Sequence, residues 1–246
     1  MKHVLGVALA TSMVVGVMAA AAIESRAAQR AQPAKTPDWS GIWEVDWRNA
    51  RKTPPRPPMK LTPPYQVKLD AFRAAQKNGE NLQSQGANCV PPGLPRIMSQ
   101  PYPIEFVFAP GKVVMLIEAY MQFRHVFTDG RKHPEDPDPT FMGHSIGHWE
   151  NDTLVVDSVG FTESTQLADG VPHSDQLRIV ERFRRVSPEW MEVQTTLVDP
   201  VVLAEPYTST SSYRHLDDEI REYICLENNR DSADDKGRPG LSLEKK

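Results

Sequence analysis

From residue 104 onward, apolar and polar side chains alternate in short runs that end at Pro, Gly, Asp or Ser. A period of two residues indicates half-buried β-strands, and those four residue types are common in the turns between strands. We predict strands at residues 104–108, 113–128 with a bend near Met121, 143–149, 153–159, 177–184, 190–199, 207–215 and 220–226. So many short strands with almost no helix predict an all-β antiparallel barrel or sandwich.

The chain before residue 104 has another pattern, because eight prolines lie within residues 31–64. Proline donates no backbone hydrogen bond, so this segment cannot form a regular central strand except where the prolines are interrupted. The interruption is residues 39–47, in which Trp43 and its neighbours alternate as in a strand with one aromatic face. Residues 62–79 begin with Thr-Pro, carry apolar residues at helical spacing and end in glycine, so they predict one short helix.

Residues 1–22 have the layout of a secretory signal peptide, with a basic start, an uncharged apolar run and alanines near its end. An uncleaved anchor is the alternative, because a helix that spans a membrane needs about 20 apolar residues. Since Gly, Ser, Thr and Ala make this run only weakly apolar, we predict cleavage, no stable membrane insertion and a periplasmic or secreted protein. We divide the chain into the signal peptide (1–22), a Pro-rich arm with the first strand and the helix, packed on the barrel (23–103), the main β-barrel (104–228) and a disordered tail (229–246).

Cys89 and Cys225 are the two cysteines of the chain. An exported protein meets an oxidising compartment, so we predict that they form a disulfide. A bridge that closes so long a loop stabilises the fold by ~4 kcal/mol in the chain-entropy model. The alternative is a pair of buried free thiols.

The charge balance excludes some classes of function. The 28 basic and 32 acidic residues give a net charge of −4, without the basic face that nucleic-acid binding needs. The sequence has no phosphate-binding loop, no dinucleotide fingerprint and no haem-attachment motif, so we predict no organic cofactor. We make no prediction of the oligomeric state.

Two stretches resemble known families. Gly41-Ile42-Trp43, ahead of a series of strands, resembles the Gly-x-Trp signature of lipocalin-like (calycin) barrels, which implies a barrel of about eight to ten strands. The Gly-His-Ser-Ile-Gly motif at 143–147 and Pro-His-Ser at 172–174 are similar to a family of exported bacterial proteins, over about residues 89–228. That resemblance implies a shared fold and a shared central site, and it implies no activity.

Strand alternation predicts where the acidic residues point. Leu177, Ile179, Glu181 and Phe183 share one face, and Glu118, Tyr120 and Arg124 share another if no bulge intervenes. A barrel lumen with acid, base and phenol groups predicts a ligand chamber. Arg124 is the expected counter-ion of an inward carboxylate, since an unpaired buried charge is costly. The alternative is an Arg-Glu bridge that only orders the barrel.

His144 and His173 are the best candidates for proton transfer, because imidazole titrates near neutrality. Adjacent strand residues point to opposite sides, so neither His-Ser pair of the two motifs can act as its own dyad, although cross-pairing stays open. A metal could be shared by His173 and Asp175, whereas His144 and His148 are ~13 Å apart along a strand; we predict no metal site. The predicted catalytic residues are His144, His173, Glu118 and Glu181, and the predicted substrate-binding residues are Tyr120, Arg124, Ser145, Ser174 and Asp175.

These residues support three hypotheses. The leading one is a cofactor-independent acid-base enzyme (lyase, isomerase or hydrolase) that acts on a small, largely apolar molecule. The second is a lipocalin-like binding or carrier protein for a hydrophobic ligand, in which polar groups only orient the ligand. The third is an envelope structural or interaction protein, which would expose an apolar patch instead of enclosing a cavity.

Overall fold

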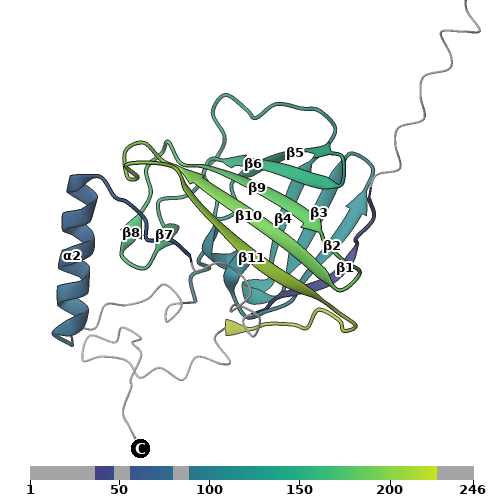
Figure 1. Cartoon of the computed structure of the whole chain (residues 1–246), viewed down its shortest axis with the longest axis horizontal. Helices are drawn as coiled ribbons and strands as arrows, with labels where there is room; N and C mark the ends of the chain where they lie inside the picture. The colour runs from purple at the N-terminus through teal and green to yellow at the C-terminus, as the bar shows by residue number, and fades with distance from the viewer. Residues whose placement is uncertain (1–36, 47–55, 80–88, 226–246) are drawn as a thin grey trace, which may run out of the picture. The chain divides into compact units, whose positions relative to one another are not determined.

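The computed structural model describes residues 37–46, 56–79 and 89–225, and their main feature is a closed β-barrel (Figure 1). In the described residues nine strands close in the order β1-β11-β10-β9-β6-β5-β4-β3-β2. Their bounds are β1 Gly41–Val45, β2 Ile104–Ala109, β3 Lys112–Ile117, β4 Gln122–Phe127, β5 His144–Glu150, β6 Thr153–Val159, β9 Arg178–Arg185, β10 Trp190–Val198 and β11 Tyr207–Leu216. The predicted all-β barrel is therefore confirmed, although β4 and β5 run parallel rather than antiparallel.

The strand β1 closes the barrel. It pairs antiparallel with β2 on one side and with β11 on the other, so the barrel begins at residue 41 rather than at residue 104. Trp43 of the Gly-Ile-Trp triplet is 0% exposed, and its ring meets the ring of His215 edge to face at 5.1 Å. The closed barrel and this buried tryptophan fit the lipocalin-like resemblance.

A short 3-10 turn, η3 (Ala119–Met121), separates β3 from β4. It confirms the bend expected near residue 121, and Tyr120 and Met121 adopt positive φ angles of 57° and 49° there. Before the turn, in β3, Met115 points inward (0% exposed) whereas Leu116 is 37% exposed. In β4 the residue opposite Met115 is Arg124. The single face predicted for Glu118, Tyr120 and Arg124 is therefore wrong.

The hairpin in the centre of the chain and the strand after it form as predicted. β5 and β6 pair in register from His144–Val159 to Glu150–Thr153, and Asn151 takes the left-handed conformation (φ 57°) in the turn between them. In β9, Ile179, Glu181 and Phe183 are all at most 1% exposed. The uninterrupted alternation of this strand therefore predicted correctly which of its side chains point into the barrel.

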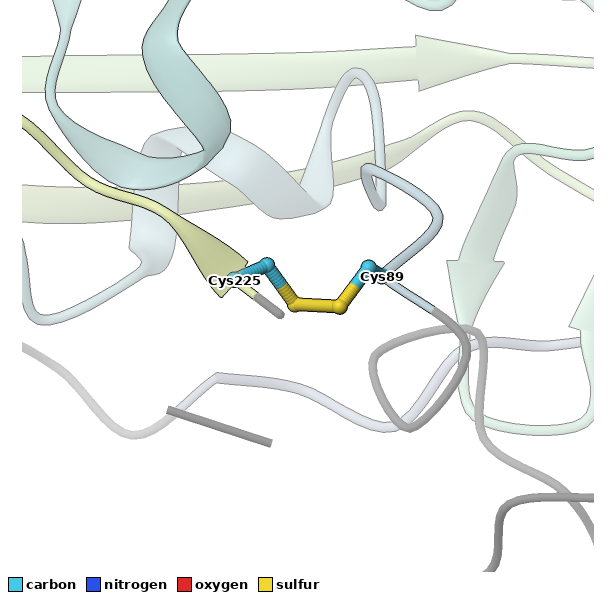
Figure 2. Close-up of a disulfide and its surroundings, with 2 residues drawn as sticks. All are labelled: Cys89 and Cys225. Carbon is cyan, nitrogen blue, oxygen red and sulfur yellow. A yellow bond between two sulfur atoms is a disulfide. The ribbon is translucent and has the colours of Figure 1, made fainter. Parts of the chain in front are cut away.

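The disulfide between Cys89 and Cys225 is confirmed (Figure 2). The two Cα atoms are 5.6 Å apart, and 136 residues separate the cysteines in the sequence. The bridge joins the loop before β2 to the segment after β11, and this fits an oxidising compartment.

The strand predicted at residues 220–226 is wrong, because its described part, up to Cys225, has no β pairing. The predicted signal peptide, Trp47 and the predicted tail lie outside the described residues.

Among the described residues, a helix and a small sheet adjoin the barrel. The predicted helix is α2 (Pro63–Lys77), which begins after Thr62 and buries Leu69. Residues 161–176, between β6 and β9, contain a two-stranded sheet, β7 (Gln166–Ala168) and β8 (Val171–Pro172), and α2 lies beside β8 (Figure 1). A 3-10 turn, η2 (Arg96–Ser99), contacts β7. Among the residues that the structure describes, no helix has the length and apolar character needed to cross a membrane.

Candidate functional site

Glu181 and Arg124 form an ion pair inside the barrel. Each is 1% exposed, and Arg124 Nη2 lies 2.5 Å from Glu181 Oε2. Arg124 also donates to two inward hydroxyl groups, from Nε to Ser145 Oγ (3.0 Å) and from Nη2 to Ser158 Oγ (2.8 Å). The predicted pairing of Arg124 with an inward carboxylate therefore forms, and Ser145 belongs to it. Because every charged group in this network has a partner, the arrangement corresponds to the bridge that orders the barrel rather than to a vacant reaction site.

Glu118 and Tyr120 do not reach that network. Glu118 is half-buried at the start of the η3 turn, and its Oε2 accepts a hydrogen bond from the backbone N–H of Arg221 (2.9 Å). Tyr120 packs against Tyr223 with ring centroids 5.3 Å apart. Burial is the main cause that raises the pKa of the Tyr120 hydroxyl, and the neighbouring Tyr102 adds to it. The positions predicted for these two residues in the lumen are wrong, because the turn takes them out of phase with β4.

His144 points away from the lumen, since the next residue, Ser145, is the inward one. The Nδ1 atom of His144 lies 2.8 Å from Nδ1 of His133, and its ring stacks on Phe127 at a centroid distance of 5.5 Å. Desolvation lowers the pKa of His144 below its ordinary value, and the nearby His133 and Arg131 lower it further. His144 is thus held as a neutral imidazole on the outside of the barrel.

His133, the residue that contacts His144, also lies close to a carboxylate. Its Nε2 is buried, makes no hydrogen bond in the described residues and lies 3.6 Å from Asp157 Oδ2. Asp157 in turn accepts two hydrogen bonds from Arg178, at 2.7 and 2.5 Å. A hydrogen bond between two Nδ1 atoms needs one of them unprotonated, so the two rings together hold at most one positive charge while they stay bonded.

This pair makes the stability depend on pH. Because the folded-state pKa of His144 is lowered, the unfolded chain binds the proton more readily, and stability falls as the pH drops below the unfolded value of about 6.5. We expect the variant His144→Gln to lose less stability than the wild type between neutral and mildly acidic pH, as measured by urea unfolding at each pH. Parallel loss in the two proteins would contradict this assignment.

His173 and Ser174 hold the loop that follows β8. Nδ1 of His173 donates to the carbonyl oxygen of Ser174 (2.7 Å), and Nε2 lies 2.7 Å from Thr165 Oγ1 and 2.9 Å from the carbonyl oxygen of Thr162. The backbone N–H and the hydroxyl of Ser174 both donate to Asp199, at 2.7 and 2.8 Å. Asp175 is exposed beside them. These contacts are separate from those of His144, so the structure does not bring the two predicted proton carriers together.

A cavity in the described residues lies between the barrel wall and α2. Its volume is about 750 Å³, and we call it the chamber. One wall is the inner face of β10 and β11, and the opposite wall is formed by α2, η2 and the β7–β8 sheet. No predicted site residue lines it. The sequence signal was the alternation in residues 207–213, which turns a row of hydroxyl groups inward.

The lining of the chamber is amphipathic. The barrel wall contributes the hydroxyl-bearing residues Thr195, Tyr207, Ser209 and Ser211. The apolar lining includes Leu69, Phe72, Met98, Leu167, Val193 and Leu197. Such a combination of apolar surface with a few convergent polar groups is typical of small-molecule sites.

A second, smaller groove of about 470 Å³ lies on the outside, along β4 and the segment that leads into β5. His144 and Phe127 line it together with His125. Phe123, also on this groove, is 62% exposed. Among the described residues, no group of three or more His, Cys, Asp or Glu side chains could hold a metal ion.

Comparisons with known proteins add little to this geometry. No protein-family model matches the sequence, and no curated protein matches it. Among solved structures, the chain is similar to a secretory abundant heat soluble (SAHS) protein from Ramazzottius varieornatus, with 12% sequence identity and a TM-score of 0.29 over 74% of this chain and 100% of that chain. The functional conclusions below therefore depend on the residues of the barrel itself.

Proposed function

We propose that this protein binds a small, hydrophobic molecule in the chamber, as an exported binding or carrier protein. The observation that carries the proposal is the chamber itself, which has about 750 Å³ of space between the inner face of β10 and β11 and the segments that cover it. Ligand pockets have volumes of about 300–1,000 Å³. The disulfide fits the same setting, since an exported carrier works in an oxidising compartment.

The chamber is open for a physical reason. Two of the inward residues of β11 that face it are small, since Ser209 and Ser211 stand opposite Thr195 and Val193 of β10. In the other part of the barrel the inward residues are large, and Trp39, Phe106 and Phe183 pack ring against ring at 5.2 to 6.4 Å. Aromatic packing thus closes one region of the lumen, whereas the short hydroxyl side chains leave the other empty.

The acid-base enzyme is the less supported hypothesis. It needs the imidazoles and carboxylates within hydrogen-bond reach of one point in space. Glu181 is instead paired with Arg124, His144 is paired with His133, and His173 is bonded within its own loop. Binding requires no such convergence, so binding is the function that the geometry favours.

Filling the chamber tests the proposal. We expect Ser209→Phe to weaken the binding of an uncharged apolar probe, N-phenyl-1-naphthylamine, by at least about tenfold, which corresponds to ~1.4 kcal/mol. The ring would occupy the ligand's space, because Ser209 lines the chamber. Binding is measured by the rise in probe fluorescence.

The neighbouring Thr208 provides a matched control. It is exposed on the opposite face of the same strand, so Thr208→Phe should leave probe affinity unchanged. Circular dichroism shows whether both variants are folded. Equal probe affinity in the wild type and in folded Ser209→Phe protein would exclude the chamber as the binding site.

A further inference from the structure

We infer that the ligand of the chamber carries a negative charge at one end, a carboxylate or a similar anionic group, which lies at the rim between Arg56 and Arg73 while its apolar part extends inward. This inference rests on the proposed function and adds the chemical class of the ligand. It follows from the charge of the lining, from the depth at which its groups lie, and from the lack of an ionic partner for Arg56 and Arg73 among the described residues.

The charged lining is strongly one-sided. Three guanidinium groups line the chamber, those of Arg56, Arg73 and Arg96, against a single carboxylate, that of Asp169. Asp169 already forms an ion pair with Arg96. No carboxylate of the lining therefore balances the charges of Arg56 and Arg73, although the protein as a whole is acidic with a net charge of −4.

Neither of these two guanidinium groups has an ionic partner in the part of the chain that the structure describes. Arg56 donates from Nη2 to the neutral hydroxyl of Ser211 (3.2 Å), and this bond directs its head toward the barrel wall. Arg73 extends from α2, on the other side of the chamber. Two cations from opposite walls suit one anionic group between them, because guanidinium binds carboxylate through paired N–H donors.

The depth of the groups sets the orientation of the ligand. Arg56 and Arg73 are exposed, whereas Val193 and Leu197 are each 2% exposed. An anion at the rim keeps part of its hydration, and the apolar part of the molecule gains the burial that drives binding. A molecule with the reverse orientation would place its charge beside buried apolar side chains. A cationic ligand would meet two like charges at the entrance.

The experiment compares ligands of one chain length with three different ends. Decanoate, decan-1-ol and decyltrimethylammonium are titrated as competitors of N-phenyl-1-naphthylamine, at low and at high salt. Because exposed charges interact weakly and are screened by salt, we expect decanoate to bind about three- to tenfold more tightly than decan-1-ol at low salt. That preference should shrink at high salt, and decyltrimethylammonium should bind most weakly.

Charge-removing variants locate the effect. Arg56→Gln and Arg73→Gln should each reduce the preference for decanoate, and the double variant should abolish it, because each change lowers the affinity for decanoate more than the affinity for decan-1-ol. Arg182→Gln is the control, because it removes one positive charge from an exposed residue that pairs with Glu150 and does not line the chamber. It should keep the preference.

The outcomes separate the two proposals. If decanoate and decan-1-ol bind equally well, the anionic ligand is excluded and chamber binding stands. If the preference survives in the double variant, Arg56 and Arg73 are not its cause and the inference fails. If none of the three compounds displaces the probe and the probe itself does not bind, the proposed function fails as well.

Discussion

Removing the disulfide, with Cys89→Ser and Cys225→Ser together, is expected to lower the free energy of unfolding by about 4 to 5 kcal/mol. The bridge spans 136 residues of sequence, and a cross-link over so long a loop removes much of the entropy of the unfolded chain. The measurement is urea unfolding of the double variant and of the wild type, followed by tryptophan fluorescence.

The disulfide prediction has an internal control. Wild-type protein treated with a reductant should show the same loss as the double variant, because both lack the same bond. A loss of less than about 1 kcal/mol in both would show that the unfolded chain is already compact without the bridge. The bridge would then contribute little beyond its local geometry.

The second large effect is expected at the ion pair in the lumen. Glu181→Leu leaves the guanidinium of Arg124 buried without a counter-charge, which costs about 3 to 5 kcal/mol. The two side chains are 1% exposed, so solvent cannot replace the lost carboxylate. The change appears as a lower urea midpoint.

The double variant Arg124→Met with Glu181→Leu distinguishes an unpaired charge from a packing defect. It removes both charges and keeps most of the volume, so it should regain most of the stability that the single variant loses. If the double variant is as unstable as the single one, the pair acts through shape and through its bonds to Ser145 and Ser158. In that case the electrostatic explanation is wrong.

The sequence predicted the parts of the fold that depend on local patterns. The unbroken alternation of residues 177–184 turned Glu181 inward, and the Thr-Pro start with helical apolar spacing predicted α2. The disulfide prediction followed from the predicted signal peptide and the cysteine count. Each of these features depends on residues within one segment or on the compartment of the protein.

The errors in the predicted site arise at the η3 turn, which changes the side of the sheet on which the following side chains lie. Tyr120 and Met121 turn the chain with positive φ angles, which are uncommon for residues other than glycine and give no sequence signal. Beyond that turn the alternation restarts, so Glu118 and Arg124, predicted on one face, are separated. A shift of one residue moves every later side chain to the other side of a sheet.

The chamber was missed for a different reason. Arg56 and Ser211 are 155 residues apart in sequence, and nothing local indicates that they meet. The predicted histidines stood in a conspicuous motif, yet the structure gives them hydrogen-bonding partners on the outside and in a loop. A motif rich in titratable residues was therefore a poor guide to where the open space lies.

Because β4 and β5 pair in parallel over a short length, the strands around the barrel are not joined equally well. Only two residue pairs join these strands, whereas eight join β10 and β11. A hairpin cannot connect parallel neighbours, so the chain makes a long excursion through residues 128–143 before it returns. The β4–β5 pairing at Val126 and Ser145 is therefore the weakest strand pairing of the barrel. If these two strands separate locally by thermal motion, water reaches the guanidinium of Arg124.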